Sequence, residues 1–308
     1  KAEHFVWKKK WKKLLDWNFE TAKIKWFDGA YLNITENCLD RHLSENGNKI
    51  AITWISNNIN EPSKNITYNK LHKEVCKFAN VLKKYGVKKG DRICLYMPMI
   101  PELTIAMLAC ARIGAIHSVV FAGFSAKSLS DRINDAKCSI LITADGSFRG
   151  EKIIPLKEIA DQATKITPSI KKCVVVKRVQ NKINFNNEKD VWWHKEMEDV
   201  SNDCNAKSME AEDTLFILYT SGSTGKPKGI QHSIAGYMVY AEYSFRNVFQ
   251  YKQNDIYWCT ADIGWITGHS YIVYGPLLSG ATTIMFEGIP SHPNYSRFWE
   301  IIETYKVT

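Results

Sequence analysis

Residues 214–231 read TLFILYTSGSTGKPKGIQ, and this stretch decides the interpretation of the whole chain. Its first part, Thr214 to Tyr219, is a short apolar run with two β-branched and two aromatic residues, which predicts a buried strand. The loop that follows, Thr220 to Ile230, contains three glycines, four hydroxyl side chains and two lysines. Glycines let backbone N–H groups approach a ligand, and the hydroxyls and lysines add donors and positive charge. The loop therefore has the groups needed to hold a polyphosphate.

The same composition is also typical of a flexible hydrophilic surface loop, and the usual P-loop pattern G-x-x-x-x-G-K-(S/T) fails because Pro227 follows Lys226. We expect positive φ angles at the three glycines, of which Gly229 is the last. Ser233 is the expected N-cap of a helix that runs to about Phe249 and directs its dipole toward the loop. The residues predicted to hold phosphate are Thr220, Ser221, Gly222, Ser223, Thr224, Gly225, Lys226 and Lys228.

Upstream of this loop, apolar runs alternate with amphipathic segments. Strands are expected at 92–97, 115–121 and 139–143, and helices at 69–85, 101–113 and 125–134. Near-continuous apolar strands in such a β-α-β-α-β order predict an α/β fold with a parallel sheet covered on both faces. Ligands of such sheets bind beyond the carboxyl ends of the strands. The loop after residue 143, ADGSFRGEK, is therefore either an ordinary connection or an anion site with Arg149 and Lys152.

Several further elements are expected with less regular patterns. The list comprises strands at 24–27, 50–55, 172–179, 255–260 and 281–286, a helix beginning at Asp190, helices at 156–163 and 297–305, and a turn at 262–269 that leads into a helix through Leu278. The division that we expect is an N-terminal extension (1–60), a first α/β subdomain (61–210) and the start of a second one with the phosphate loop (211–308).

Composition and charge exclude several classes of protein. The chain has 308 residues, of which 45% are hydrophobic, and a net charge of +9. The lysines are scattered apart from a run at Lys8 to Lys13. This run is expected to form an amphipathic surface helix, with Trp7, Trp11 and Leu14 packed on the body, or alternatively a membrane-surface element. Without a basic-aromatic stripe, this charge does not indicate a nucleic-acid binder. No apolar stretch approaches the length of a membrane span.

The eight cysteines are spread evenly without a C-x-x-C pair, which indicates free thiols in a reducing compartment and no zinc site. We expect a cytoplasmic protein, or a mitochondrial one if a targeting segment precedes Lys1. The sequence gives no indication of the oligomeric state.

The order of residues in the loop indicates a family. Tyr219 to Gly229 matches (Y/F)-T-S-G-(S/T)-T-G-x-P-K-G, the signature of the adenylate-forming enzymes. Four further stretches resemble the acetyl-CoA synthetases, the AMP-forming acetate–CoA ligases: FAGFSAKSLSDRINDAKCSILITADGSFRG, VWWHKEM, LNITENCLDRHL and ADIGWITGHSYIVYGPLLSGATTIMFEG. The likeness extends from about Trp17 to Thr308. It implies ATP, acetate and CoA as substrates, an acetyl-adenylate intermediate, and acetyl-CoA, AMP and pyrophosphate as products.

The resemblance also implies site residues. The acyl pocket would be lined by Trp265, Ile266 and Thr267. The CoA site would comprise Arg149, Gly150, Glu151, Lys152, Thr267 and Ser291. Two of these depart from the family pattern, because Glu151 stands where a small residue is usual and Ser291 stands where Asn is common. His269 is expected to be a hydrogen-bonded structural residue, and no catalytic residue is assigned.

Members of this family are roughly twice as long, and their later motifs are absent from the 308 residues. These motifs supply the adenylation lysine and an aspartate for the ATP ribose, and ligands of the expected Mg²⁺ are not found here either. We therefore expect an N-terminal portion of such a ligase, with an incomplete second subdomain, that is inactive alone. The alternatives are a propionyl-CoA or other short-chain acyl-CoA synthetase and a non-catalytic nucleotide- or CoA-binding module.

Overall fold

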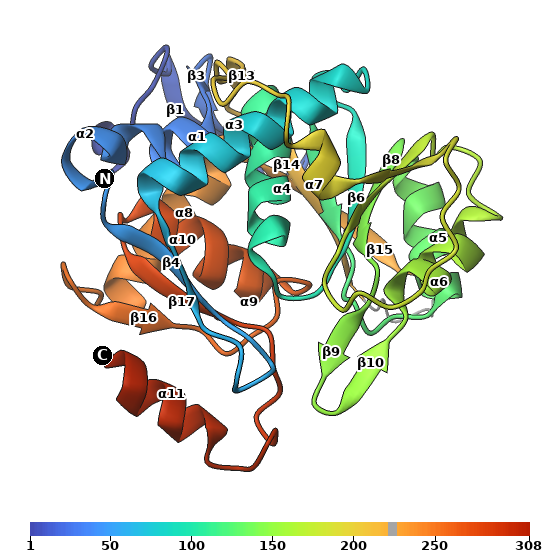
Figure 1. Ribbon diagram of the computed structural model, residues 1–308. Coiled ribbons are helices and arrows are strands. Elements are labelled where there is room, and N and C mark those ends of the chain that lie inside the picture. The colour runs from blue at the N-terminus through green and yellow to red at the C-terminus, as the bar shows by residue number, and fades with distance from the viewer. Residues whose placement is uncertain (221–226) are drawn as a thin grey trace.

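Parallel strands form the centre of the molecule, as expected (Figure 1). A computed structural model describes residues 1–220 and 227–308. The strands are β1 (Lys13–Asn18), β2 (Lys23–Asp28), β3 (Tyr31–Leu32), β4 (Ile50–Ile55), β5 (Lys64–Thr67), β6 (Arg92–Tyr96), β7 (Ile116–Val119), β8 (Ile140–Ala144), β9 (Ser147–Arg149), β10 (Lys152–Ile154), β11 (Lys172–Val176), β12 (Asp190–Trp192), β13 (Met209–Glu210), β14 (Thr214–Thr220), β15 (Lys228–Ser233), β16 (Ile256–Trp258) and β17 (Thr282–Phe286).

The helices are α1 (Ile34–Cys38), α2 (Leu43–Asn46), α3 (Tyr68–Lys84), α4 (Pro101–Ile113), α5 (Ala126–Ala136), α6 (Leu156–Thr164), α7 (Trp193–Glu196), α8 (Ile234–Val248), α9 (Ile266–Gly268), α10 (Gly275–Leu278) and α11 (Arg297–Tyr305). Two 3₁₀ turns, η1 (Ala2–His4) and η2 (Asp40–His42), lie near the N-terminus, and a π-helical segment, η3 (His269–Tyr274), joins α9 to α10.

The larger sheet has seven strands in the order β12-β11-β8-β6-β7-β14-β15. All neighbours are parallel except β14 and β15, which form an antiparallel hairpin. The chain moves from β6 to β7 through α4 and then back across β6 to β8 through α5. Because such crossovers are right-handed, this reversal places α4 on one face and α5 with α6 on the other. The reversal also leaves a crevice at the carboxyl ends of β6 and β7, the usual ligand position in such sheets.

The smaller sheet has four strands in the order β16-β17-β4-β5, with β5 antiparallel to the rest. One face packs on the helix layer shared with the larger sheet: the indole N–H of Trp54 donates to the carbonyl of Met99 just before α4, at 2.9 Å. The other face is covered by α11, through a small apolar cluster that contains Ile301, Ile284 and Phe286. The two sheets therefore share one core, and their parallel strands end around a common space.

The strongest patterns were predicted correctly. Helix α4 has the expected limits, with Pro101 in its first turn and Gly114 in the left-handed conformation (φ 77°) at its end. The side chain of Ser125 caps α5 by accepting from the N–H of Ser128. Strand β8 is buried at every position, as the apolar run at 139–143 indicated. The α/β class with parallel strands is thus confirmed.

The expected helix at Lys8 to Lys13 is wrong. The backbone of Lys9 pairs with Tyr31 instead, and Lys13 begins β1, which pairs with β2 in an antiparallel hairpin. Trp7 and Trp11 pack together and against Phe27, with ring centroids 5.0–5.2 Å apart. Their packing on the body was predicted correctly, whereas the packing expected for Leu14 is wrong, because this side chain is 49% exposed. Tertiary pairing with residues 23–31 overrides the helical spacing.

The helix expected at Asp190 is also wrong in its first turn, because residues 190–192 extend the larger sheet as β12. Helix α3 begins one residue before the expected 69, with Thr67 as its N-cap, whose hydroxyl accepts from the N–H of Lys70. The proposed division at residues 60 and 210 stays a prediction. The larger sheet draws strands from both sides of residue 210, and the smaller sheet draws strands from all three parts. In the part of the chain that the structure describes, no helix is long and apolar enough to cross a membrane.

Candidate functional site

A cavity of about 310 Å³ opens where strands of both sheets end. It lies beyond the carboxyl ends of β6, β7, β8, β16 and β17, as the rule for parallel sheets requires. The wall includes Met99, Phe121, Gly123, Phe148, Arg149, Asp262, Glu287 and Pro290. Apolar walls with a few charged groups are typical of pockets for small molecules and cofactors.

The predicted CoA segment forms the hairpin β9–β10, with Gly150 and Glu151 at its tip. Gly150 adopts φ 62°, a conformation that favours glycine. Arg149, Glu151 and Lys152 are all exposed, and of these three Arg149 lines the cavity. Asn57, in the loop after β4, fixes the tip: its amide donates to the Gly150 carbonyl and its Oδ1 accepts from the Gly150 N–H, both at 2.9 Å.

Ser291, predicted to contact CoA from a distant part of the sequence, lies in the loop that packs on this tip. A Cβ placed on Gly150 would come within 3.1 Å of Ile289 and 3.7 Å of His292, the neighbours that flank Ser291. The structure thus brings 149–152 and 289–292 together, although more than a hundred residues separate them.

The predicted acyl-pocket residues lie at the start of α9. Trp265, Ile266 and Thr267 are all exposed, and the Trp265 ring packs near Phe121 and Phe124, with centroids 6.0 and 6.2 Å away. Phe121 itself lines the cavity, so Trp265 stands at its rim. The assignment of these three residues to an acyl pocket stays a prediction.

Asp262 was not predicted, although it lies three residues before Trp265. Its Oδ1 accepts from the N–H of Gly264 at 2.7 Å. Burial raises the pKa of Asp262 to about 6. The hydrogen bond from Gly264 and the positive charge of Arg149 both act to lower this pKa, but burial has the larger effect. Arg149 and Asp262 therefore place opposite charges in one cavity.

His269 has the structural role that we expected. It is fully buried, and its Nδ1 lies 3.1 Å from the Trp265 carbonyl, so the ring ties η3 to the start of α9. Burial lowers the pKa of His269 to about 4, and the imidazole is therefore neutral near pH 7.

The predicted phosphate loop is described only at its two ends. Ser221, Gly222, Ser223, Thr224, Gly225 and Lys226 lie outside the described residues. Thr220 ends β14 and Lys228 begins β15; the two are cross-strand partners and both are exposed. They lie at the carboxyl end of β14, the edge of the sheet where β6, β7 and β8 also end.

Side chains connect this end of β14 to Trp265. The Tyr219 hydroxyl donates to Asp135 of α5 at 2.6 Å. The guanidinium of Arg132, also on α5, lies 5.7 Å from the Tyr219 ring and 4.6 Å from the Phe124 ring. Because Phe124 packs on Trp265, the base of the loop and the rim of the cavity belong to one packed cluster.

Two details of the loop prediction are wrong. Gly229 does not adopt a positive φ but lies in β15, where a Cβ would come within 3.1 Å of the Tyr219 ring. Strand β15 was missed, and it carries the chain back so that Ser233 pairs with Thr214. The N-terminus of α8 therefore lies at the opposite end of the hairpin from the loop, about 20 Å away at the usual rise of a strand.

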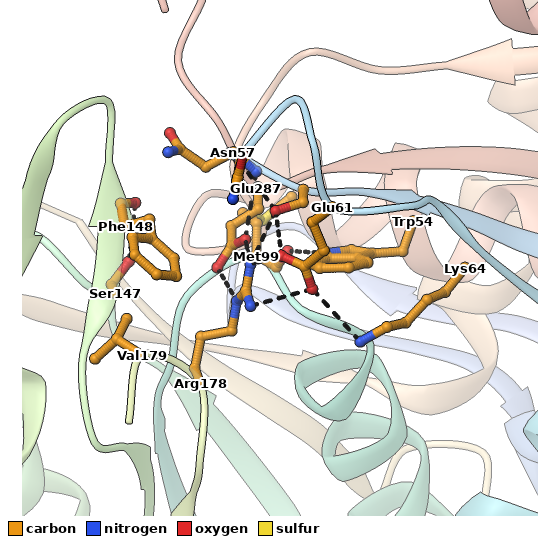
Figure 2. A network of polar contacts seen from close by, with 12 residues as sticks. Trp54, Asn57, Glu61, Lys64, Met99, Ser147, Phe148, Arg178, Val179 and Glu287 are labelled. Atoms are coloured by element: carbon orange, nitrogen blue, oxygen red, sulfur yellow. Dashed lines mark hydrogen bonds and ion pairs between the residues drawn. The ribbon is translucent and has the colours of Figure 1, made fainter. Parts of the chain in front are cut away.

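A network of buried charges that includes Glu287 of the cavity wall was also missed (Figure 2). Arg178 follows β11 and donates to Glu287 after β17, to Glu61 and to the Ser56 hydroxyl. Burial acts to lower the pKa of Arg178, but its ion pairs outweigh this effect and raise it. Ser56 and Glu287 directly follow apolar runs predicted as strands, and that position was the available signal for these two residues. Arg178 lies within the predicted strand 172–179, and Glu61 lies in a polar loop, so neither stood out in the sequence.

No group of three or more His, Cys, Asp or Glu side chains within residues 1–220 and 227–308 is arranged to hold a metal ion.

Comparison with known proteins agrees with this geometry. Residues 39–308 match the family model of the AMP-binding enzymes, and residues 1–38 match that of the acetyl-coenzyme A synthetase N-terminus. The chain belongs to the AMP-binding enzyme family. A parallel α/β fold with a cavity at the strand ends is thus the scaffold of an AMP-binding enzyme.

Curated AMP-binding enzymes align along the whole chain. Acetyl-coenzyme A synthetase of Bdellovibrio bacteriovorus is 54% identical over 308 residues, and that of Leptospira biflexa is 55% identical over 313 positions; each alignment covers 100% of this chain and 48% of the relative. Acetyl-coenzyme A synthetase 2 of Pseudomonas aeruginosa is 54% identical over 98% of this chain and 46% of its own length. The chain therefore spans about half the length of the curated relatives that it matches.

Proposed function

We propose that the chain is part of an AMP-forming acetate–CoA ligase and contributes its ATP-phosphate and CoA subsites. The observation that carries the proposal is the cavity at the shared strand ends, where Arg149, Asp262 and the loop next to Ser291 converge. The names of relatives at 51–55% identity support the same activity.

The phosphate subsite is assigned to residues 220–228 because their described ends, Thr220 and Lys228, lie at the carboxyl edge of the sheet. Donors and cations at this edge would meet the charge that develops on the β- and γ-phosphates as pyrophosphate leaves. With the N-terminus of α8 at the far end of β15, the charge has to come from lysines and from backbone N–H groups of the loop itself.

The CoA subsite is assigned to the β9–β10 hairpin, where Arg149 and Lys152 are exposed cross-strand partners and Arg149 lines the cavity. Cations on a rigid hairpin suit the nucleotide phosphates of CoA. Glu151 lies between them at the tip and opposes an anion, and Ser291 offers a hydroxyl. Thr267, exposed on α9, is assigned to the same CoA subsite. The acyl pocket is assigned to the segment that contains Trp265. Mg²⁺ would enter with ATP.

The cellular location also belongs to this proposal. All eight cysteines are free thiols, which fits a reducing compartment and hence the cytoplasm.

Acetate-dependent ATP–pyrophosphate exchange and CoA-dependent formation of acetyl-CoA by the complete gene product test the proposal. We expect both activities, with loss of the second in an Arg149→Ala, Lys152→Ala variant that keeps the first. Stronger turnover with propionate or butyrate than with acetate would favour another short-chain acyl-CoA synthetase. CoA binding without either reaction would favour a binding module.

A further inference from the structure

Three loops that leave the two sheets meet at Arg178 (Figure 2). Its Nε donates to Glu287 Oε1 at 2.7 Å, and its Nη2 donates to Glu61 Oε2 at 2.8 Å and to the Ser56 hydroxyl at 3.0 Å. A second bond joins Nη2 to Glu287 Oε2 at 2.5 Å. One guanidinium therefore holds the loops after β4, β11 and β17.

The guanidinium also lies close to two aromatic rings. It lies 5.0 Å from the Trp54 ring on β4 and 4.9 Å from the Phe148 ring on β9. Arginine suits this place because its planar group can stack and donate several bonds in fixed directions, which lysine cannot do. Through Phe148, Arg178 contacts the hairpin that carries the predicted CoA cations.

Burial makes the network costly unless it is complete. The Glu287 side chain is 0% exposed and that of Arg178 is 12% exposed. Buried ion pairs add little net stability compared with apolar residues of similar size, because desolvation offsets their attraction. Stability alone therefore does not account for this pair, whereas fixed geometry between three loops does.

The network reaches the rim of the cavity through Asn57. The Asn57 N–H lies 3.5 Å from Glu287 Oε2, and the Asn57 side chain makes both hydrogen bonds to Gly150. Glu287 is followed directly by Gly288, Ile289 and Pro290, which form the opposite wall. Both walls of the subsite are thus connected to one buried charge.

We propose that Arg178 is a positioning residue that sets the β9–β10 hairpin against the 288–292 loop through Glu287, Asn57 and Phe148. The consequence for CoA rests on the proposed function, whereas the positioning of the hairpin does not.

The test is hydrogen–deuterium exchange of residues 147–154 in the full chain, combined with calorimetric titration of CoA. Arg178→Met alone leaves buried carboxylates unpaired, so the variant to use is the double Arg178→Met, Glu287→Gln. We expect the Gly150 amide to exchange about tenfold faster and CoA to bind about tenfold more weakly. Asn57→Ala should also accelerate exchange of the Gly150 amide. Arg178→Lys should not keep this exchange at the rate of the unaltered chain.

The matched control is Arg112→Met, Asp40→Asn. This is another arginine–carboxylate pair, with a buried arginine, a half-buried carboxylate and N–O distances of 2.8 and 2.9 Å, at the end of α4 remote from the cavity. It should leave hairpin exchange and CoA affinity at their original values. If the Arg178 double variant folds with unchanged hairpin exchange, the positioning role is wrong. If the hairpin loosens but the unaltered chain does not bind CoA, the positioning role stands and the CoA assignment fails.

Discussion

At the scale of single residues, His269 makes the stability of the fold dependent on pH. Its folded-state pKa is about 4, below the ordinary value of 6.5, because the ring is buried. Between these two values the unfolded chain binds a proton that the folded chain does not. Its contribution to stability is therefore complete above pH 6.5 and is lost as the pH falls toward 4.

We expect His269→Asn, which keeps a donor near the Trp265 carbonyl but does not titrate, to reduce this dependence. Between pH 6.5 and 5 the unaltered chain should lose about 2 kcal/mol of unfolding free energy more than the variant. Urea unfolding at several pH values measures the difference. Equal losses in both proteins would show that His269 is not the group responsible.

At the scale of elements, Asp145 fixes the connection after β11 that presents Arg178. Its Oδ1 accepts from the N–H groups of Gly146, Arg178 and Val179 at 2.7–3.0 Å, and its Oδ2 accepts from that of Gln180 at 2.7 Å. A buried carboxylate with four backbone donors organises a turn that has no regular structure of its own.

Asp145→Ala should lower the unfolding free energy by about 3 kcal/mol or more, because it leaves several buried N–H groups unpaired. The control is Asp91→Ala, which removes a bond to the exposed N–H of Lys88 and should cost about 1 kcal/mol. Chemical unfolding provides both values. Similar losses in the two variants would contradict the role given to Asp145.

Elements were predictable where packing follows a short-range pattern. Helix α4 and strand β8 are apolar throughout and lie where the sequence indicates. Strand β15, with the sequence KGIQHS, is mostly exposed and has no alternation, so only its pairing with β14 makes it a strand. The run at Lys8 to Lys13 failed for the opposite reason, since helical spacing was present but pairing with distant residues prevailed.

At the scale of the whole molecule, the accessibility of the cysteine thiols is a measure of how tightly the core is packed. Seven of the eight cysteines are buried, and Cys259 alone is half-buried, at the cavity wall. Burial raises the pKa of Cys259, which slows its reaction with alkylating agents.

We expect N-ethylmaleimide to modify at most one thiol of the native protein, Cys259, and all eight in urea. Mass spectrometry counts the adducts, and Cys259→Ser should abolish native labelling. Rapid modification of several thiols in the native protein would contradict the buried core.

The site was predictable only in part, and the whole molecule explains why. Residues 149–152 stood out because a strand end, a glycine and two cations are adjacent in sequence. Glu287 is 109 positions from its partner Arg178 and 230 positions from its partner Asn57. No local sequence pattern connects these three residues. Their meeting follows from the two sheets sharing one core, which single-sequence patterns do not describe.

The pairing of β4 has a consequence for synthesis of the chain. Its antiparallel neighbour β5 emerges from the ribosome directly after it, whereas its parallel neighbour β17 is made some 230 residues later. During that interval one edge of an apolar strand has no partner, and such edges invite association between nascent chains. We therefore expect the smaller sheet to be a region of this chain that benefits from a chaperone during translation.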